Sequence, residues 1–239
     1  DEVALLLIGG VNYYTGQYLD IKKIAELGHA KKCMVGIDLA HGAGNIQPNL
    51  HDSSIDFAAW CTYKYLNSGP GSLSGLFVHE KHAQRKDLPR FAGWWNHNKE
   101  TRFNMRQPFD VMEGAEGWQL SNPPILSMAA IKASLDIFEK VGMDVLVKKS
   151  KKLTGFFEYL VNEIASDTIE IITPTNPNER GCQLSLQVKN ADKNLHKKLT
   201  ENNIITDWRE PDVIRCAPVP MYTSFEDVYH MVTILESLL

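Results

Sequence analysis

The chain has 239 residues, of which 44% are hydrophobic and 23% are charged, and its formal net charge is −4. This composition is that of an ordinary globular protein with one large domain or two modest ones. The sequence has no dense basic cluster, which argues against a nucleic-acid partner, and no apolar window of about 18 residues, so we predict no transmembrane helix.

Four cysteines are spread along the chain, and none forms a CxxC pair or has a histidine at zinc-finger spacing. They are Cys33, Cys61, Cys182 and Cys216. This usage favours a reducing, cytoplasmic compartment. The stretch HEKH at 79–82 lacks the spacing of the HExxH zinc motif, so we predict no metal site there.

The first third of the chain alternates between apolar runs of strand length and one amphipathic helix. We expect strands at 3–11, 33–40, 55–61 and 75–80 and a helix at 21–33, with Asp20 as its N-cap. Strand, helix, strand with short loops predicts an α/β fold with a mostly parallel sheet. The chain opens on a strand without an initiator methionine, and we therefore expect it to be the later part of a longer protein.

The segment 90–124 is irregular and rich in aromatic and amide residues, which favours a binding role. Two helices are predicted next, at 125–142 and 143–165. A small α+β region then follows, with strands at 169–173, 182–188, 204–207 and 213–217 and helices at 192–202 and 224–238. We expect 1–140 to be part of a large domain and 141–239 to form a connecting helix and a small C-terminal domain.

Two residues at predicted strand ends suggest a cofactor site. Asp38 lies at the end of one buried strand and Lys64 just past the end of another, and ligands gather at the carboxyl ends of parallel strands. Pyridoxal phosphate needs a lysine amine for its aldehyde and a carboxylate that keeps its ring nitrogen protonated. A loop-capping aspartate and a solvated lysine remain the alternative from spacing alone, and His41 alone is more often a hydrogen-bonding loop residue.

Longer stretches of sequence make the pattern more specific. DLAHGAGN, WCTYKYLNSGPG, GWW, SNPPIL and RCAPVPMYTSFEDVY occur in this order. Together they resemble the kynureninase family of pyridoxal-phosphate enzymes, which have the fold-type I (aspartate aminotransferase) architecture and are related to class V aminotransferases. The resemblance covers nearly the whole chain. It implies the sheet of the pyridoxal-phosphate-binding large domain, incomplete at its N-terminal side, plus the small α+β domain.

The resemblance assigns roles to four residues near the cofactor. Lys64 is implied to be the Schiff-base lysine and the base that takes the substrate's α-proton. Asp38 is implied to hold the pyridinium nitrogen, and His41 to lie near the cofactor. Tyr63 is implied to donate its hydroxyl to the cofactor phosphate and to relay a proton.

Further residues are implied to reach the substrate. Arg215 matches the family arginine that binds the α-carboxylate, for which a guanidinium fork is well suited, although a surface ion pair is the alternative. Trp94 and Asn122 match residues that reach cofactor and substrate, in such dimers from the neighbouring subunit; a packed loop aromatic and a turn residue are the alternatives. Asn12 and Tyr14 are weaker candidates for the same cleft.

The implied reaction is hydrolysis of L-kynurenine, or its 3-hydroxy form, to L-alanine and the matching anthranilate, in a cytoplasmic homodimer of tryptophan catabolism. Two other hypotheses stay open. One is another fold-type I enzyme, such as a class V aminotransferase or a cysteine desulfurase. The other is an inactive fragment, because the family's phosphate-binding threonine loop and ring-stacking aromatic precede anything in this chain.

Overall fold

The computed structural model describes residues 2–105, 108–164, 167–191 and 193–239. The chain divides into two compact units, which we describe separately. The first unit comprises Asp1–Ile8, Asp20–Ala43 and Pro48–Asp136. The second comprises Gly9–Leu19, Gly44–Gln47 and Ile137–Leu239.

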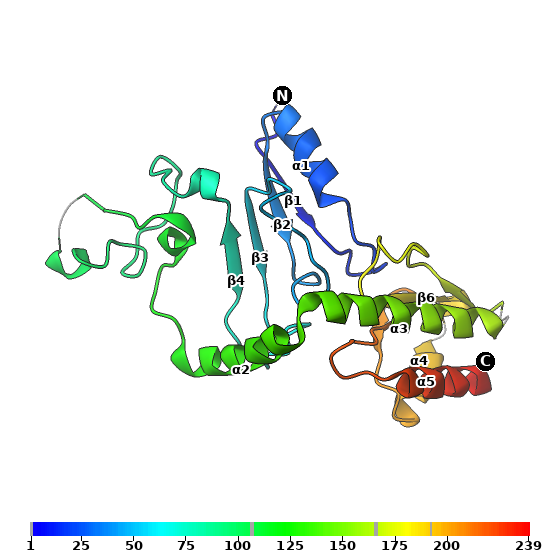
Figure 1. The fold of residues 1–239 in the computed structure, drawn as a ribbon. Helices are drawn as coiled ribbons and strands as arrows, with labels where there is room; N and C mark the ends of the chain where they lie inside the picture. The colour runs from blue at the N-terminus through cyan, green and yellow to red at the C-terminus, as the bar shows by residue number, and fades with distance from the viewer. Residues whose placement is uncertain (1, 106–107, 165–166, 192) are drawn as a thin grey trace. The chain divides into compact units, whose positions relative to one another are not determined.

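A four-stranded sheet with the order β1-β2-β3-β4 forms the centre of the first unit (Figure 1). Its strands are β1 (Leu5–Gly9), β2 (Met34–Asp38), β3 (Phe57–Trp60) and β4 (Gly75–Val78). β3 is parallel to β2, and β4 is antiparallel to β3, so the sheet is mixed. The expected α/β class is confirmed, and the antiparallel strand is β4.

Helix α1 (Ile21–Ala30) connects β1 to β2 and packs on β2. Asp20 caps it as expected, because its Oδ1 accepts the backbone N–H of Lys23 at 2.9 Å. The buried face carries Ile21, Ala25 and Gly28. A Cβ at Gly28 would lie 2.6 Å from the side chain of Val35, so the absent side chain permits the close approach of helix and strand.

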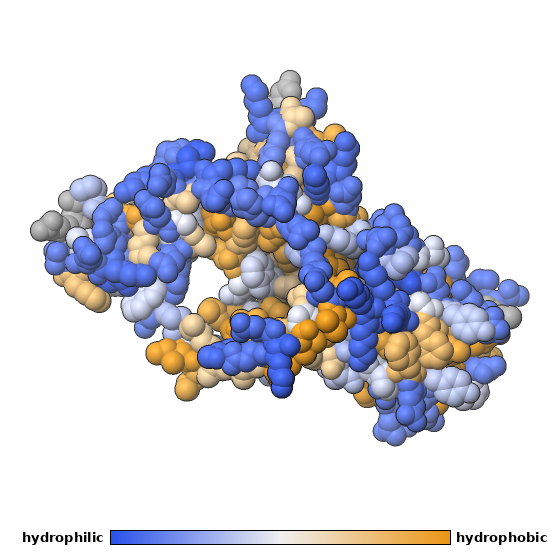
Figure 2. All heavy atoms as spheres, in the orientation of Figure 1, coloured by the Kyte–Doolittle hydropathy of each residue, from blue (hydrophilic) through white to orange (hydrophobic). Residues whose placement is uncertain are grey.

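The irregular segment that follows β4 contains three short 3₁₀ turns, η1 (Glu80–His82), η2 (Arg102–Asn104) and η3 (Gly114–Trp118). Helix α2 (Ile125–Val141) then begins, and α3 (Met143–Glu163) follows directly after Gly142. Helix α2 ends just before Gly142, whose φ of +84° is a backbone conformation that favours glycine. Several apolar side chains of α2 reach the surface (Figure 2), and Leu126 is 90% exposed.

The second unit has its own sheet, with the order β5-β6-β8-β7 and antiparallel pairings throughout. Its strands are β5 (Ile169–Ile171), β6 (Leu184–Val188), β7 (Asp207–Arg209) and β8 (Val213–Cys216). The 3₁₀ turn η4 (Lys189–Ala191) and the helices α4 (Lys193–Glu201) and α5 (Phe225–Leu238) complete the unit.

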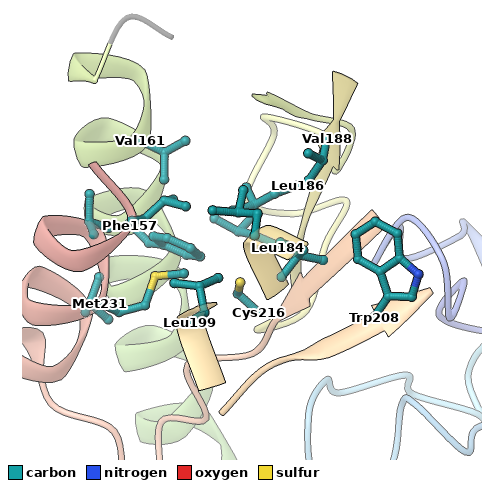
Figure 3. Packing of buried hydrophobic residues seen from close by; sticks show 14 of the residues in the cluster. Phe157, Val161, Leu184, Leu186, Val188, Leu199, Trp208, Cys216 and Met231 are labelled. Carbon is teal, nitrogen blue, oxygen red and sulfur yellow. The ribbon is translucent and has the colours of Figure 1, made fainter. Parts of the chain in front are cut away.

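Side chains from α3, α5 and this sheet form the main hydrophobic core, in which Phe157, Leu184, Leu186 and Met231 meet (Figure 3). Ser224 caps α5 by accepting the backbone N–H of Asp227 at 3.0 Å. The small α+β arrangement was therefore predicted correctly from the apolar pattern.

One expected strand was misplaced, and two expected helix ends cannot be compared. The strand expected at 204–207 lies at Asp207–Arg209, where Trp208 is buried, whereas Ile205 is 82% exposed. Residues 165 and 192, at the ends of two expected helices, lie outside the described residues. Within the described ranges, no helix combines the length and apolarity that crossing a membrane requires.

Candidate functional site

The carboxyl ends of β2 and β3 bring the loops that carry Asp38 and Lys64 to the same edge of the first sheet. Asp38, the last residue of β2, is the register partner of Ala59 in the parallel strand β3. The backbone N–H of Leu39 continues this pairing, with its bond to the carbonyl oxygen of Ala59 at 2.8 Å. Lys64 follows β3 by four residues. Both candidate residues therefore occupy the edge where ligands bind in such sheets.

The two loops also contact each other. Cys61 Sγ lies 3.8 Å from the carbonyl oxygen of Ala40, and the rings of His41 and Tyr65 meet edge-to-face with centroids 5.9 Å apart. His41 and Lys64 are thus on neighbouring segments.

Hydrogen bonds within the segment 62–73 fix the loop that carries Lys64. Thr62 Oγ1 donates to the carbonyl oxygen of Leu73 at 2.7 Å, and Ser68 Oγ donates to that of Thr62 at 2.6 Å. The N–H of Asn67 donates to the carbonyl oxygen of Lys64 at 3.0 Å. Ser134 Oγ from α2 donates to the carbonyl oxygen of Leu66. Anchoring at both ends makes this loop a defined platform for the lysine.

The side chains of Lys64 and Asp38 fit a pyridoxal phosphate group. Lys64 is half-buried, and its Nζ has no hydrogen-bond or ion-pair partner within the described part of the chain. Asp38 Oδ1 accepts the N–H of Ala40 at 2.7 Å, which fixes the carboxylate, and Asp38 remains exposed. The aldehyde requires an amine, and the protonated ring nitrogen requires a carboxylate that accepts its N–H; Lys64 and Asp38 offer these two groups at one sheet edge.

Tyr63 lies beside Cys61. Its side chain is 52% exposed. The electrostatic interaction with Cys61, and a hydrogen bond between the two side chains, raise the pKa of the Tyr63 hydroxyl. Tyr63 therefore keeps its proton at neutral pH and can act as a hydrogen-bond donor, as a phosphate contact requires.

Trp94 and Asn122 lie in the irregular segment of the first unit. Trp94 is 49% exposed and packs against Phe103, with ring centroids 5.5 Å apart. Asn122 is exposed and accepts a hydrogen bond from Ser121 Oγ at 3.4 Å. No hydrogen bond or ring contact joins either residue to Lys64 or Asp38 among the residues that the structure describes.

Arg215 lies on β8 in the second unit. Its Nη1 donates to the carbonyl oxygen of Tyr13 at 2.8 Å, and its Nη2 pairs with Asp207 Oδ2. The alternative of an ion pair is therefore realised in this conformation, but the side chain is only 9% exposed, so this is not a freely solvated surface pair.

Tyr14 and Asn12 have structural partners near Arg215. Tyr14 donates its hydroxyl to Asp212 Oδ1 at 2.9 Å, and burial together with this hydrogen bond raises the pKa of Tyr14. Asn12 Oδ1 accepts the N–H groups of Tyr14 and Thr15, at 2.9 and 3.0 Å, and so closes a turn.

A charged cluster that we did not predict lies at the opposite end of β3. Asp56, only 2% exposed, accepts from Lys81 Nζ at 2.7 Å and from the N–H of Val35 at 2.6 Å. Its oxygens also lie 2.8 Å from His29 Nε2 and 2.7 Å from His82 Nε2. We call these five residues the Asp56 cluster. HEKH, dismissed as a metal motif, was the one sequence signal pointing to it.

A cysteine desulfurase needs a reactive loop cysteine, and Cys182, in the GCQ stretch at 181–183, lies two residues before β6 and is fully buried. Its N–H donates to Asn45 Oδ1 at 2.8 Å. Burial raises the pKa of its thiol to about 12, so the reactive thiolate is not populated at neutral pH.

The chain is similar to several known proteins. The family model for the kynureninase C-terminal domain matches residues 146–235. A kynureninase of Flavobacterium psychrophilum is 55% identical over 239 residues, covering 99% of this chain and 56% of the relative. A kynureninase of Myxococcus xanthus is 54% identical over 235 residues, covering 98% of this chain and 55% of the relative.

The chain is thus similar to kynureninases over nearly all of its length. It spans about half the length of the curated kynureninases that it matches.

Solved structures show the same fold at much lower identity. A cysteine desulfurase of Escherichia coli has a TM-score of 0.80 at 15% identity and matches 98% of this chain and 59% of its own. An alanine–glyoxylate aminotransferase of a Nostoc species has a TM-score of 0.73 at 17% identity and matches 98% of this chain and 61% of its own.

Proposed function

We propose that this chain is part of a pyridoxal-phosphate enzyme that hydrolyses L-kynurenine or 3-hydroxy-L-kynurenine to L-alanine and anthranilate or 3-hydroxyanthranilate. The observation that carries the proposal is the junction of the loops after β2 and β3, which bear Asp38 and Lys64, in a chain 55% identical to a kynureninase. The structurally similar C-DES, solved as a mutant with glycine covalently linked to its PLP cofactor, supports the choice of cofactor.

Four residues of the first unit would hold the cofactor. Lys64 would bind its aldehyde carbon through Nζ, and Asp38 would keep a proton on the ring nitrogen, because a carboxylate favours the charged form of a neighbouring base. His41 would lie near the ring, and Tyr63 would donate its hydroxyl to the phosphate. Pyridoxal phosphate, when bound, supplies a ring that accepts electrons from the substrate's α-carbon.

The chain's own residues would then bind the substrate and move its protons. Arg215 would hold the α-carboxylate with its guanidinium fork, and Trp94 and Asn122 would contact cofactor and substrate from the neighbouring subunit of a homodimer. Lys64 Nζ would take the proton from the α-carbon, and Tyr63 would return a proton to the alanine product after water has added to the side-chain ketone and the Cβ–Cγ bond has broken.

The remaining assignments are part of the same proposal. We assign 1–140 to the large cofactor-binding domain and 141–239 to the connecting helix and small domain, and we place the enzyme in the cytoplasm, consistent with four free cysteines among the described residues. A cysteine desulfurase is disfavoured, because Cys182 is buried and has a raised pKa.

The decisive experiment uses the whole protein that contains this chain, incubated with pyridoxal phosphate and L-kynurenine, and follows anthranilate by fluorescence. We expect anthranilate to form in the wild type and not in Lys64→Ala. Sulfide release from cysteine without anthranilate formation would instead identify a desulfurase. An absorbance scan of the 239-residue chain alone tests the inert-fragment hypothesis, which predicts no new absorbance band in the violet after pyridoxal phosphate is added.

A further inference from the structure

A single carboxylate lies between two guanidinium groups in the second unit. Asp207 on β7 and Arg215 on the neighbouring strand β8 are register partners in an antiparallel ladder, so their side chains lie on the same face of the sheet. Asp207 Oδ2 pairs with Arg215 Nη2, and the same oxygen lies 3.0 Å from Arg209 Nη2. One negative charge is thus shared by two positive charges.

The two arginines differ in their surroundings. The Arg209 side chain is 44% exposed, whereas the Arg215 side chain is 9% exposed. Arg215 Nε is buried and has no hydrogen-bond partner within the described residues. A buried guanidinium N–H without an acceptor is costly, because water cannot replace the missing bond. Arg215 therefore retains capacity for a further anionic acceptor.

The position of the Arg215 guanidinium is fixed independently of Asp207. Its Nη1 donates to the carbonyl oxygen of Tyr13. The segment around Tyr13 is anchored to β6, because Gln183 Nε2 donates to that same carbonyl at 3.1 Å and Ser185 Oγ donates to the carbonyl of Tyr14 at 2.5 Å. Removing Asp207 from Arg215 would therefore leave the guanidinium in place.

We propose that Asp207 is an exchangeable partner that occupies Arg215 until a substrate carboxylate displaces it, and that Arg209 then retains Asp207. The inference rests on the proposed role of Arg215 in binding the α-carboxylate. In the exchange, the substrate carboxylate replaces the Asp207 carboxylate as the partner of Arg215. Asp207 keeps its bond to Arg209, so no charge is left unpaired at any stage. Asp207 thereby sets the affinity of the site for carboxylates, and Arg209 favours their entry.

The experiment titrates the ¹⁵N-labelled 239-residue chain with acetate at constant ionic strength, replacing chloride, and follows the Nε–H signal of Arg215 by NMR. Arg215→Lys identifies that signal by removing it. Asp207→Asn should bind acetate roughly two- to fivefold more tightly than the wild type, as expected from loss of one competing partly exposed ion pair. Arg209→Gln should bind acetate more weakly, because Asp207 then has only Arg215 as a partner.

Glu210→Gln is the matched control for Asp207→Asn. It removes one negative charge from a neighbouring position, where Glu210 pairs with Lys193 at 3.0 Å and has no contact with Arg215. It should change the acetate affinity by less than about twofold at physiological salt, where separated exposed charges are screened. If Glu210→Gln and Asp207→Asn increased the affinity for acetate equally, the change in net charge alone would explain the effect, and the proposal would be overturned.

Two other outcomes separate this proposal from the proposed function. If other signals of the chain report unchanged acetate binding in Arg215→Lys, carboxylates bind elsewhere and the proposed role of Arg215 fails. A second outcome is that acetate binding requires Arg215, but Asp207→Asn binds acetate no more tightly than the wild type or shows no acetate-dependent shift of the Arg215 Nε–H signal. The exchange is then overturned, and Arg215 keeps its proposed role. A purely structural Asp207 predicts weaker binding in both Asp207→Asn and Arg209→Gln.

Discussion

His82 Nε2 lies 2.7 Å from Oδ1 of the buried Asp56, and this contact joins the turn after β4 to the start of β3. Asp56→Ala is expected to lower the free energy of unfolding by about 3 kcal/mol, because the buried N–H of Val35 and the ring of His82 lose their acceptor. Urea unfolding of the full chain measures this. The control is Asp52→Ala, whose partner His51 is exposed and whose loss should cost less than about 1 kcal/mol. Equal unfolding midpoints for the two variants would contradict the prediction.

The same cluster predicts how stability depends on acid. Burial alone would raise the pKa of Asp56, but hydrogen bonds from Lys81 and the two histidines outweigh it and hold the pKa well below its usual range. The stabilisation from a depressed pKa is complete above the unfolded value of about 4 and is lost as the pH falls toward the folded value. The stability difference between wild type and Asp56→Asn should therefore be constant from pH 7 to about 5 and should shrink below pH 4. A difference that is independent of pH down to 3 would show that Asp56 is not the titrating group.

Gly36 on β2 faces the ring of its register partner Phe57, and a Cβ there would lie 2.3 Å from the ring. Gly36→Ala should destabilise the chain by about 1–3 kcal/mol, because the ring must move within a packed sheet. Gly155→Ala provides the opposite case, since nothing lies within 4 Å of a Cβ at this position in α3. It should be stabilising by about 0.5–1 kcal/mol, as helix propensity predicts. Thermal or urea unfolding compares the two alanines directly.

Asp38→Ala in the whole enzyme is expected to lower kcat by at least about 100-fold, with only a modest loss of bound cofactor, because electrostatic stabilisation is lost and the amine of Lys64 remains. Steady-state anthranilate production and the absorbance of the bound cofactor measure the two effects separately. Turnover close to that of the wild type would remove Asp38 from its proposed role.

Thiol labelling should distinguish the cysteines of the native chain. Burial raises the pKa values of Cys182 and Cys216 to about 12, whereas Cys61 is only partly buried. Alkylation at pH 8, analysed by peptide mass spectrometry, should modify Cys61 at least about tenfold faster than either buried thiol. Rapid labelling of Cys182 would revive the desulfurase hypothesis.

Local pattern predicted most of the fold. The apolar runs around Val35 and Leu186 mark buried strands, and the apolar stripe of α3 marks a packed helix. The position of β7 was predicted too early in the chain, because Ile204 and Ile205 are residue types typical of strands. The burial of Trp208 instead fixes the strand at Asp207–Arg209. The helical pattern of α2 was also recognised, but pattern alone did not reveal that Leu126 would be exposed.

The candidate site was predicted only in part. The spacing of Asp38 and Lys64 indicated one sheet edge, and the parallel register of β2 and β3 agrees with that interpretation. The Asp56 cluster was missed, because its members come from α1, β2 and the turn after β4, and no motif links them. The pairing of Asp207 with Arg215 depends on the register of two antiparallel strands, which the sequence does not specify.

Asp56 lies immediately before β3, whereas Asp38 is the last residue of β2 and Lys64 follows the end of β3. A strand of this length separates the two regions by roughly 13 Å. The Asp56 cluster and the residues proposed to hold the cofactor therefore lie at opposite ends of one short strand pair. Substitutions around Asp56 can change the stability of the fold without altering the residues at the other end.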